Sequence, residues 1–540
     1  MNTAELVGRV LAGLGAGHAF GVVGSGNFEV TNALRAHGVP FTATRHECGA
    51  ATMADAYARM SGRLALVTLH QGCGLTNAMT GIGEAAKSRT PMIVLAGEVA
   101  ASAVRSNFRI DQGGAAEAVG AVADRVYSAE TAVADTLRAY RTAVYERRTV
   151  VLNLPLDVQR EPAADVPVEK PPPPQPVRPD GTVIRELAAV LGRASRPVFV
   201  AGRGARGAGP ELRALAAASG ALLATSAVAN GLFAGDPWAL GISGGFASPL
   251  TAELISGADL VVGWGCALNM WTTRHGRLLS PDAVLAQVDL DPAALGVHRP
   301  VDLGVLGDVA LTARDTLAEV VPAAGYRSAD VRARIAAAAR WRDVPFEDQS
   351  TSDRIDPRRL SVLLDSLLPA ERVVAIDSGN FMGYPSAYLS VPDEYGYVLT
   401  QAFQSIGLGL ATGIGAALAR PDRLAVAALG DGGCLMSVAE LDTVARLGIP
   451  MVIVVYNDDA YGAEVHHFGP DGANLDTVVF PDTDIAAIAR GFGLAGSTVR
   501  TPGDLGALTE WLSGPRDRAI LVDAKITSDG GSWWLAEAFH

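Results

Sequence analysis

Two loops of this sequence place acidic side chains directly after apolar, strand-like runs. The run RLAVAALG leads into Asp431 of G-D-G-G (430–433), and the run PMVIVVY leads into N-D-D (457–459), with Asp458 and Asp459 side by side. One helical segment, SVAELDTVARLG, lies between them. Because consecutive parallel strands usually lie side by side, both loops are expected at the same edge of a sheet. A divalent cation such as Mg²⁺, which prefers oxygen ligands next to a phosphate, would relieve the repulsion between the acids.

Either loop taken alone has a simpler explanation. G-D-G is common as a turn, and N-D-D is common at a helix N-terminus, where an acidic side chain caps backbone N–H groups. The two loops at this spacing, with a helix between them, favour the cation site. In that site Asp459 is expected to point to solvent or to cap the next turn.

The rest of the chain predicts the parallel sheets that such loops require. Short β-branched runs alternate with Ala- and Leu-rich helical periods, as in RLALVTLH, RPVFVAGRG and PMVIVVYND. Continuous apolar strands separated by helices predict α/β domains with mostly parallel sheets flanked by helices. Proline-rich and polar stretches divide the chain into three such domains. The predicted divisions are an N-terminal domain (1–161), a Pro-rich linker (162–180), a central domain (181–325), a second linker (326–356) and a C-terminal domain (357–540).

Composition narrows the classes of partner. A formal net charge of −13 over 540 residues gives no basic footprint, which excludes nucleic acid and anionic membrane surfaces as expected partners and leaves small anionic ligands open. The sequence shows no signal peptide and no apolar run long enough to span a membrane. Its cysteines have no C-x-x-C spacing, which favours a reducing, cytoplasmic location. They are Cys48, Cys73, Cys266 and Cys434.

The two acidic loops resemble the thiamine diphosphate (ThDP) motif, in which G-D-G is followed after a fixed interval by N-N. With this motif placed, the whole chain resembles the ThDP-dependent decarboxylase and acetohydroxyacid synthase superfamily, and most closely its benzoylformate decarboxylase-like and acetolactate synthase-like members. The resemblance implies a pyrimidine-binding domain, a central domain and a diphosphate-binding domain, in this order. It also implies that Mg²⁺ is held by Asp431, Asp458 and the main-chain carbonyl of Ala460.

The resemblance assigns further residues to the cofactor. Glu47, in RHECGAATMADAYARMSG (45–62), matches the glutamate that contacts the aminopyrimidine, and Ile406 matches the large aliphatic residue that bends the cofactor. The small residues after Glu47 are expected to pack against a partner subunit, which implies a homodimer or homotetramer with active sites at the interface. The complete set of implied cofactor residues is Glu47, Ser378, Gly379, Asn380, Gln404, Ile406, Gly430, Asp431, Gly432, Gly433, Asp458, Ala460, Tyr461 and Gly462.

The substrate side is assigned by resemblance to benzoylformate decarboxylase and pyruvate decarboxylases. LHQGCGLTNAM (69–79) matches a segment with an active-site histidine, which implies roles for His70 and Gln71. FGVVGSGNFEV (20–30) matches a loop with a substrate-contacting serine, and its counterpart is Ser25 or Gly26. YGAEVHHF places Glu464 at the position of a catalytic glutamate, with His466 and His467 beside it. His70 is the preferred proton-relay candidate among these histidines.

These assignments imply a ThDP- and Mg²⁺-dependent enzyme that decarboxylates a 2-oxo acid through an ylid and an enamine, and then releases an aldehyde or joins a second carbonyl compound. An acetolactate synthase-type carboligase is the alternative, but Glu98 stands where acetohydroxyacid synthases usually carry glutamine. VAGRGARGAG in the central domain leaves FAD binding open. An NAD-dependent oxidoreductase or a non-catalytic cofactor-binding module are remote alternatives. The first requires a complete G-x-G-x-x-G with an acid about 20 residues later, and the second would most readily lose Glu47 or His70.

Overall fold

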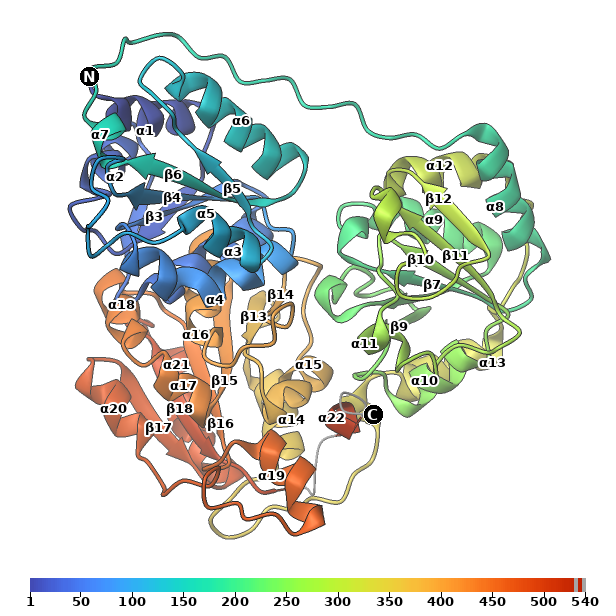
Figure 1. The fold of residues 1–540 in the computed structure, drawn as a ribbon. Coiled ribbons are helices and arrows are strands. Elements are labelled where there is room, and N and C mark those ends of the chain that lie inside the picture. The colour runs from blue at the N-terminus through green and yellow to red at the C-terminus, as the bar shows by residue number, and fades with distance from the viewer. Residues whose placement is uncertain (529–532, 537–540) are drawn as a thin grey trace.

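The computed structural model describes residues 1–528 and 533–536. It consists of three α/β domains, each built on a six-stranded sheet (Figure 1). Neighbouring strands pair in parallel in all three sheets, as in the pairs β3–β4, β7–β10 and β15–β16. The predicted fold class of three mostly parallel sheets flanked by helices is therefore confirmed.

The N-terminal domain has the strand order β2-β1-β3-β4-β6-β5. Its strands are β1 (His18–Gly21), β2 (Phe41–Ala43), β3 (Ala65–Leu69), β4 (Met92–Glu98), β5 (Val122–Arg125) and β6 (Thr149–Pro155). Its helices are α1 (Thr3–Gly13), α2 (Phe28–Ala36), α3 (Glu47–Ser61), α4 (Cys73–Lys87), α5 (Gln112–Ala118), α6 (Ala132–Tyr145) and α7 (Leu156–Gln159). The central strands β3 and β6 are buried along their whole length, because helices cover both faces of the sheet.

The C-terminal domain repeats this topology, with the order β14-β13-β15-β16-β18-β17. Its strands are β13 (Arg372–Ile376), β14 (Tyr397–Leu399), β15 (Leu424–Gly430), β16 (Val452–Asn457), β17 (Ala495–Val499) and β18 (Ile520–Lys525). Its helices are α14 (Pro357–Leu367), α15 (Gly383–Tyr388), α16 (Gly409–Ala419), α17 (Asp431–Met436), α18 (Glu440–Leu447), α19 (Gly462–Phe468), α20 (Ile485–Gly491), α21 (Gly506–Ser513) and α22 (Trp533–Ala536).

The central domain is reached through residues 163–180, which form no helix or strand and run along the outside of the molecule (Figure 1). Its strand order β12-β11-β10-β7-β8-β9 is that of the dinucleotide-binding fold. The strands are β7 (Pro197–Ala201), β8 (Leu222–Thr225), β9 (Ala239–Ile242), β10 (Leu260–Trp264), β11 (Val284–Asp289) and β12 (Leu303–Leu306). The helices are α8 (Gly181–Arg193), α9 (Gly209–Ser219), α10 (Pro249–Ser256), α11 (Met270–Thr273), α12 (Val309–Glu319) and α13 (Ala329–Ala338).

The glycines after β7 are explained by packing within the central domain. A Cβ on Gly202 would lie 2.3 Å from the carbonyl oxygen of Gly265, and a Cβ on Gly204 would lie 2.8 Å from the Cα of Gly265. The loops after β7 and β10 therefore approach each other more closely than any side chain permits. This close approach alone explains the glycines at both positions, so they are not evidence for a bound ligand.

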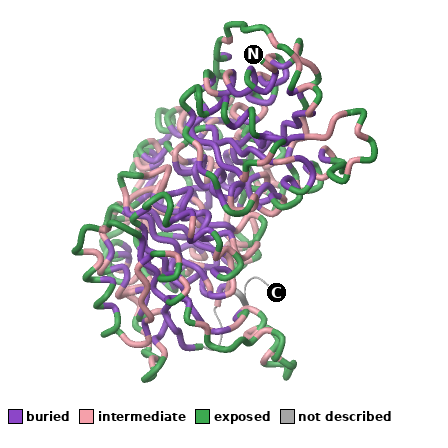
Figure 2. Tube along the Cα trace, turned by 90° about the vertical axis from the view of Figure 1, so that its left-hand side faces the viewer, coloured by how far each residue is buried: buried purple, intermediate pink, exposed green. Residues whose placement is uncertain are grey.

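One apolar core joins the N-terminal and C-terminal domains through α3 and α16, and buried segments run through both domains in Figure 2. A Cβ on Gly415 of α16 would lie 2.3 Å from the carbonyl oxygen of Met53 of α3. On the other side of α3, a Cβ on Gly81 of α4 would lie 2.8 Å from the Ala51 Cβ. The small residues of α3 thus serve close packing against α4 and α16 of the same chain, and their expected use against a partner subunit is corrected.

Buried polar groups also link these domains. Glu84, near the end of α4, accepts the backbone N–H groups of Ala402 (3.2 Å) and Phe403 (2.7 Å) from the loop after β14. Arg59 of α3 pairs with Asp55 of the same helix at 3.0 Å and donates to the Leu399 carbonyl oxygen of β14 at 3.0 Å. Burial raises the pKa of the Glu84 carboxyl group, and the negative charge of Asp55 adds to the rise. The N-terminal domain is therefore fixed to the loop that leads toward residues 404–406.

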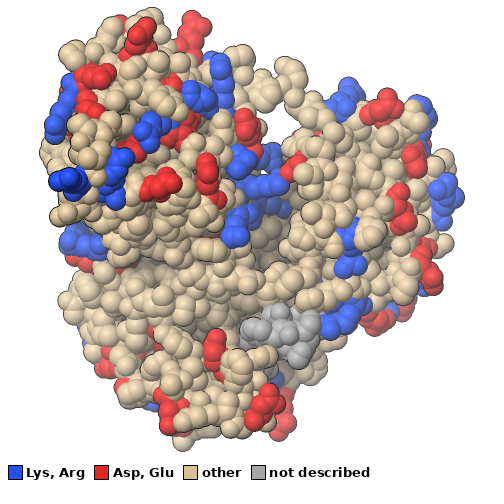
Figure 3. Space-filling view, in the orientation of Figure 1, with Lys and Arg blue, Asp and Glu red and all other residues tan. Residues whose placement is uncertain are grey.

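Charged side chains of both signs are interspersed over the face shown in Figure 3, and Lys and Arg gather where the N-terminal and central domains meet. At this junction Arg89 pairs with Asp291 at 2.6 Å, Arg203 donates to the carbonyl oxygen of Ser88, and Arg206 donates to that of Arg59 at 3.0 Å. Within the part of the chain that the structure describes, no helix has the length and apolar character needed to cross a membrane.

Candidate active site

Three loops at one edge of the C-terminal sheet carry most of the residues that the sequence assigns to the cofactor. Strands β13, β15 and β16 are neighbours and pair in parallel, with Gly430 opposite Tyr456. Their carboxyl ends therefore open at the same edge of the sheet, which is where ligands bind in such sheets. The prediction that the two acidic loops share one edge is confirmed.

The carboxyl groups of Asp431 and Asp458, which follow the paired strand ends Gly430 and Tyr456, interact with each other. Burial raises the pKa of both carboxyl groups, and the negative charge of Asp431 raises that of Asp458 further. Two neighbouring buried carboxyl groups need a shared proton or a cation, because two bare carboxylates would repel each other.

This donor set fits Mg²⁺, which prefers carboxylate oxygens and binds them in the deprotonated form. Among residues 1–528 and 533–536 no group of three or more His, Cys, Asp or Glu side chains could hold a metal ion. The remaining ligands to a cation at Asp431 and Asp458 would therefore be other oxygen atoms, such as the main-chain carbonyl of Ala460 and the oxygens of a bound diphosphate.

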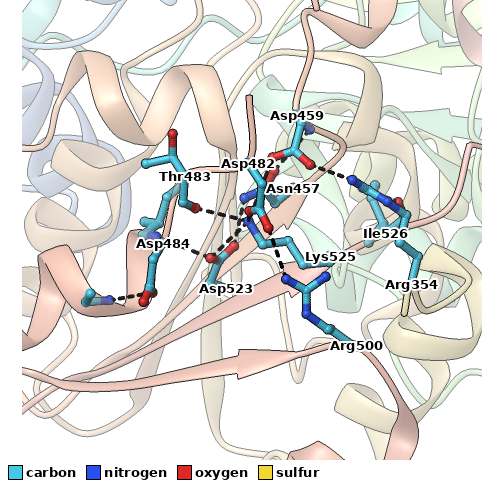
Figure 4. Close-up of polar contacts among 12 residues, drawn as sticks. Arg354, Asn457, Asp459, Asp482, Thr483, Asp484, Arg500, Asp523, Lys525 and Ile526 are labelled. Carbon is cyan, nitrogen blue, oxygen red and sulfur yellow. Dashed lines mark hydrogen bonds and ion pairs between the residues drawn. The ribbon is translucent and has the colours of Figure 1, made fainter. Parts of the chain in front are cut away.

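Asp459 does not point to solvent, and the prediction that it does so or caps the next turn is wrong. It is 8% exposed, and its φ angle of +54° lies in the left-handed region. Its carboxylate accepts a hydrogen bond from Arg354 at 2.5 Å and lies 3.7 Å from the Lys525 ammonium (Figure 4). The left-handed turn sends consecutive acidic side chains in different directions, so that Asp458 faces Asp431 while Asp459 faces two cations.

Glycines allow close approach around this acid pair. A Cβ on Gly462 would lie 2.2 Å from Asp458 Oδ2, and one on Gly432 would lie 2.6 Å from the Tyr461 ring. A Cβ on Gly433 would lie 2.4 Å from Asp377 Oδ2. Larger residues at these positions would therefore displace the groups that form the site.

Asp377, which the sequence analysis did not select, supports the loop with Ile406. The Asp377 carboxylate accepts the backbone N–H groups of Gly407 (2.9 Å) and Leu408 (3.1 Å) as well as that of Ser378 (2.9 Å). It is fully buried, and burial raises its pKa to about 7. An acid directly after the apolar strand β13 was the sequence signal that could have identified it.

The other predicted residues of this half lie around the same loops. Ser378 Oγ donates to the Gln404 carbonyl oxygen over 3.4 Å, which brings the segments 378–380 and 404–406 together. Gln404 is exposed with a φ angle of +62°, and Ile406 is half-buried. The carbonyl oxygen of Asn380 accepts a hydrogen bond from the Trp534 indole at 2.9 Å.

Two further predicted residues precede α19. Ala460 forms an isolated antiparallel bridge with Val479, and the backbone N–H of Tyr461 donates to the Val478 carbonyl oxygen at 2.8 Å. The Tyr461 ring packs edge-on against Phe480, with 5.0 Å between the ring centroids. The segment 478–480 thus holds the chain between Asp459 and Gly462 in place. Gly379, in the loop after β13, has a φ angle of +137°.

The predicted pyrimidine-side and substrate-side residues gather at the carboxyl edge of the N-terminal sheet. Glu47 is the first residue of α3, and its Oε2 accepts a hydrogen bond from Asn77 of α4 at 3.0 Å. His70 follows β3, and its Nε2 lies 3.3 Å from Ser25 Oγ. The ring of Phe108 packs edge-on against His70, with 5.1 Å between the ring centroids. Asn77 is a second residue that sequence reasoning missed, although it lies in the quoted segment 69–79.

Ser25 and Gly26, the two alternatives for the substrate-side residue of this loop, have different surroundings in the structure. A Cβ on Gly26 would lie 1.8 Å from Gln71 Oε1, so this glycine packs directly on Gln71, whereas the Ser25 hydroxyl faces His70. Gln71 is 4% exposed, and its Oε1 accepts no hydrogen bond among the described residues. The loop 24–26 therefore covers Gln71, which separates it from solvent while His70 stays accessible.

Two remaining candidates lie apart from these contacts. Glu464 is an exposed residue of α19, next to His466 and His467. Glu98, at the end of β4, pairs with Arg125 at 2.7 Å, and burial is the main cause of its raised pKa. No hydrogen bond or ion pair between described residues connects the Glu47 and His70 group with the Asp431 and Asp458 group.

Comparisons with known proteins agree with this arrangement. Residues 1–121 match the thiamine pyrophosphate enzyme, N-terminal TPP binding domain; residues 184–316 match the central domain; and residues 377–524 match the C-terminal TPP binding domain. Thiamine pyrophosphate (TPP) is another name for ThDP.

Full-length relatives carry different activities in their names. The chain is 30% identical to the sulfoacetaldehyde acetyltransferase of Rhodobacter capsulatus, over 100% of this chain and 96% of that protein. It is also 30% identical to a probable 2-ketoarginine decarboxylase of Pseudomonas aeruginosa, over 94% of this chain and 90% of that protein. The solved structure of a ThDP-dependent 4-hydroxybenzoylformate decarboxylase from Rhodococcus jostii has the same fold, with a TM-score of 0.83, 22% identity, and coverage of 98% of this chain and 100% of that one.

The chain therefore belongs to the ThDP-dependent enzymes of the decarboxylase and carboligase superfamily.

Proposed function

We propose that this protein is a Mg²⁺-dependent ThDP enzyme that removes CO₂ from a 2-oxo acid and then releases an aldehyde or joins a second carbonyl compound. The observation that carries the proposal is that Asp431 and Asp458 follow two paired parallel strands and meet at one edge of the C-terminal sheet. A shared cation at this pair would hold an anionic diphosphate beside the glycine loop 430–433.

ThDP, when bound, supplies a nucleophilic carbon and an electron sink for the decarboxylation. The residues that would hold its diphosphate and Mg²⁺ are those of the three loops after β13, β15 and β16. Ile406 would support the bend between its two rings, and Asp377 fixes the backbone directly after Ile406. The chain thus contributes binding and orientation, while the bond chemistry belongs to the cofactor.

Glu47 would exchange a proton with a ring nitrogen of the aminopyrimidine. Asn77 occupies Glu47 Oε2 at 3.0 Å, which leaves Oε1 for the cofactor and fixes the plane of the carboxyl group. The donor is a neutral amide, so it orients the carboxyl group without placing a positive charge beside it.

His70 and Ser25 would transfer protons on the substrate side. His70 Nδ1 lies 3.2 Å from the Gln71 carbonyl oxygen, so a proton on Nδ1 is held there and Nε2 accepts from the Ser25 hydroxyl. This pair can pass a proton between a substrate oxygen and solvent, because Ser25 is exposed and His70 is half-buried.

We propose further that two copies of the chain complete each active site. The Glu47 group and the Asp431 group lie in different domains, and large apolar side chains stand exposed near both. They include Val23, Phe28 and Phe108 on the N-terminal side and Met436, Tyr461 and Phe480 on the C-terminal side. A second copy that covers these side chains would bring a pyrimidine half opposite a diphosphate half, as a homodimer or a homotetramer.

Calorimetric titration with ThDP, with and without Mg²⁺, tests the proposal. We expect ThDP to bind only with Mg²⁺, and Glu47→Gln to retain binding but lose CO₂ release. CO₂ release should be screened over a panel of 2-oxo acids that includes 2-ketoarginine and 4-hydroxybenzoylformate, with and without an aldehyde acceptor, and sulfoacetaldehyde should be tested as a substrate in its own right. A product formed only with the acceptor would favour the carboligase, and absence of ThDP binding to the wild-type protein would reject the proposal.

A further inference from the structure

The second acid of the N-D-D loop, Asp459, belongs to a partly buried charge cluster. The cluster comprises Arg354, Asn457, Asp459, Asp482, Arg500, Asp523 and Lys525, most of which lie at the carboxyl ends of β16 and β18 (Figure 4). β16 and β18 pair in parallel with Asn457 opposite Lys525. Asp523 and Lys525 are two residues apart in one strand, so their side chains point to the same face.

Lys525 is the centre of this cluster. It is 1% exposed, and its ammonium group lies 2.5 Å from Asp482, 3.3 Å from Asp523 and 3.7 Å from Asp459. It also donates to the Thr483 carbonyl oxygen at 3.0 Å. A buried ammonium group is costly unless it is paired and fully hydrogen-bonded, and these partners meet that requirement.

The charges of the cluster balance. Arg354, Arg500 and Lys525 contribute three positive charges, and Asp459, Asp482 and Asp523 contribute three negative charges. Asp459 is therefore paired with Arg354 and Lys525, although its negative charge still adds to the effect of burial in raising the pKa of Asp431.

The cluster also fixes the backbone on both sides of Asp458. Asn457 donates through Nδ2 to Asp523 at 2.8 Å and accepts the Asp459 N–H at 3.0 Å. The carbonyl oxygen of Asp459 accepts the Phe480 N–H at 2.8 Å. Arg354 bridges the loop to β18, since it donates to Asp459 at 2.5 Å and to the Ile526 carbonyl oxygen at 3.1 Å.

These contacts stabilise the left-handed backbone conformation of Asp459. A non-glycine residue with φ near +54° is uncommon and persists where surrounding contacts impose it, although Asp and Asn tolerate it better than other residues. The turn is what directs Asp458 toward Asp431. Contacts that hold Asp459 in this conformation therefore also hold Asp458 in its position.

We propose that Arg354 and Lys525, acting through Asp459, are positioning residues that set Asp458 and the Ala460 carbonyl for a divalent cation shared with Asp431. This inference rests on the proposed function. Arg354 and Lys525 contact Asp459 and not the acid pair, so their effect is on the placement of Asp458 and Ala460. Partners of metal ligands in this kind of arrangement change metal affinity by about 10- to 100-fold when they are removed.

The test uses Asp459→Asn and Arg354→Met. Asparagine tolerates the left-handed backbone and keeps the shape of the side chain, so the first variant removes the charge with little strain. Arg354 is partly exposed, and its replacement by methionine leaves the buried Lys525 with all of its acidic partners. Arg500→Met is the matched control, because Arg500 pairs with the exposed Asp482 at 3.0 Å and does not contact Asp459.

ThDP binding is measured by calorimetry over a series of Mg²⁺ concentrations, and thermal unfolding of each protein without cofactor is recorded. We expect Asp459→Asn and Arg354→Met each to raise the Mg²⁺ concentration required for half-maximal ThDP binding by about 10-fold or more. At saturating Mg²⁺ the ThDP affinity should change much less. Arg500→Met should leave both values unchanged.

Three results overturn the inference. They are an unchanged Mg²⁺ requirement in both test variants, an equal loss in Arg500→Met, or a loss of ThDP affinity that saturating Mg²⁺ does not restore. Each of these leaves the proposed function standing if the wild-type protein binds ThDP with Mg²⁺. If the wild-type protein itself does not bind, the proposed function fails together with the inference.

Discussion

Gly462→Ala tests whether Asp458 is a metal ligand without any change to an acidic residue. The alanine Cβ would lie 2.2 Å from Asp458 Oδ2, whereas an ordinary van der Waals contact begins at 3.4 Å. The carboxylate must therefore retreat by about 1 Å. Gly462 is the first residue of α19, so its backbone accepts alanine, and the substitution by itself favours the helix slightly.

A displacement of this size is large for Mg²⁺, which requires near-ideal octahedral geometry with oxygen atoms at about 2.0–2.1 Å. We expect the Mg²⁺ requirement for ThDP binding to rise by about 100-fold, which corresponds to about 2.7 kcal/mol. Turnover at a fixed Mg²⁺ concentration below saturation should fall in proportion to the lost occupancy.

The measurement is a calorimetric ThDP titration at several Mg²⁺ concentrations. Gly469→Ala is the matched control, because its Cβ would lie 3.5 Å from Leu475 Cδ1, an ordinary contact at the end of the same helix. Equal Mg²⁺ requirements in the two variants, with both proteins folded, would refute the assignment of Asp458 as a ligand.

Three further predictions concern other parts of the two sites. His70→Ala should lower the rate of CO₂ release by about 100-fold or more while ThDP affinity changes less than 3-fold, and equal losses in both would count against a substrate-side role. Asn77→Ala should remove the hydrogen bond to Glu47 and lower turnover by about 10-fold. Asn77→Asp would place a second carboxylate about 3.0 Å from Glu47, and its turnover, measured as a pH-rate profile, should be lower than that of Asn77→Ala. The pKa of Asp377 is raised from 3.8 to about 7, so the folded state binds the extra proton between these values and wild-type stability should fall as pH rises from about 4 to 7. Asp377→Asn should remove this part of the slope in thermal unfolding midpoints measured from pH 5 to 8, and an identical slope in both proteins would contradict it.

The parts of the fold that depend on local pattern were predictable from the sequence. The runs RLAVAALG and PMVIVVYN form β15 and β16, because continuous β-branched and apolar residues fit a strand covered on both faces. Their order in the chain places them side by side, and from this alone the proximity of Asp431 and Asp458 follows. The pairing of Ser25 with His70 also agrees with the loop assignment, since both follow neighbouring strands.

The parts that depend on tertiary register were not predictable. Asp459 was expected to point to solvent or to cap the next turn, but it is paired with Arg354 and Lys525, which lie 105 and 66 positions away in the sequence. Which lysine meets it is set by the alignment of Asn457 with Lys525 across two strands. In the same way, the small residues of α3 predict that another helix packs closely against it, but the sequence does not say which one. The structure shows that α4 and α16 pack there.

Helix α4 contacts residues assigned to the pyrimidine side of the cofactor and also the loop that leads to Ile406. Asn77 in its first half holds Glu47, while Glu84 near its end holds the backbone at residues 402–403, just before Gln404 and Ile406. These two contacts lie about 10 Å apart along the helix axis. In a dimer of the proposed kind, Glu47 and Ile406 of one chain serve different active sites. One helix would then support residues of two different active sites, so that a substitution within α4 would disturb both of them.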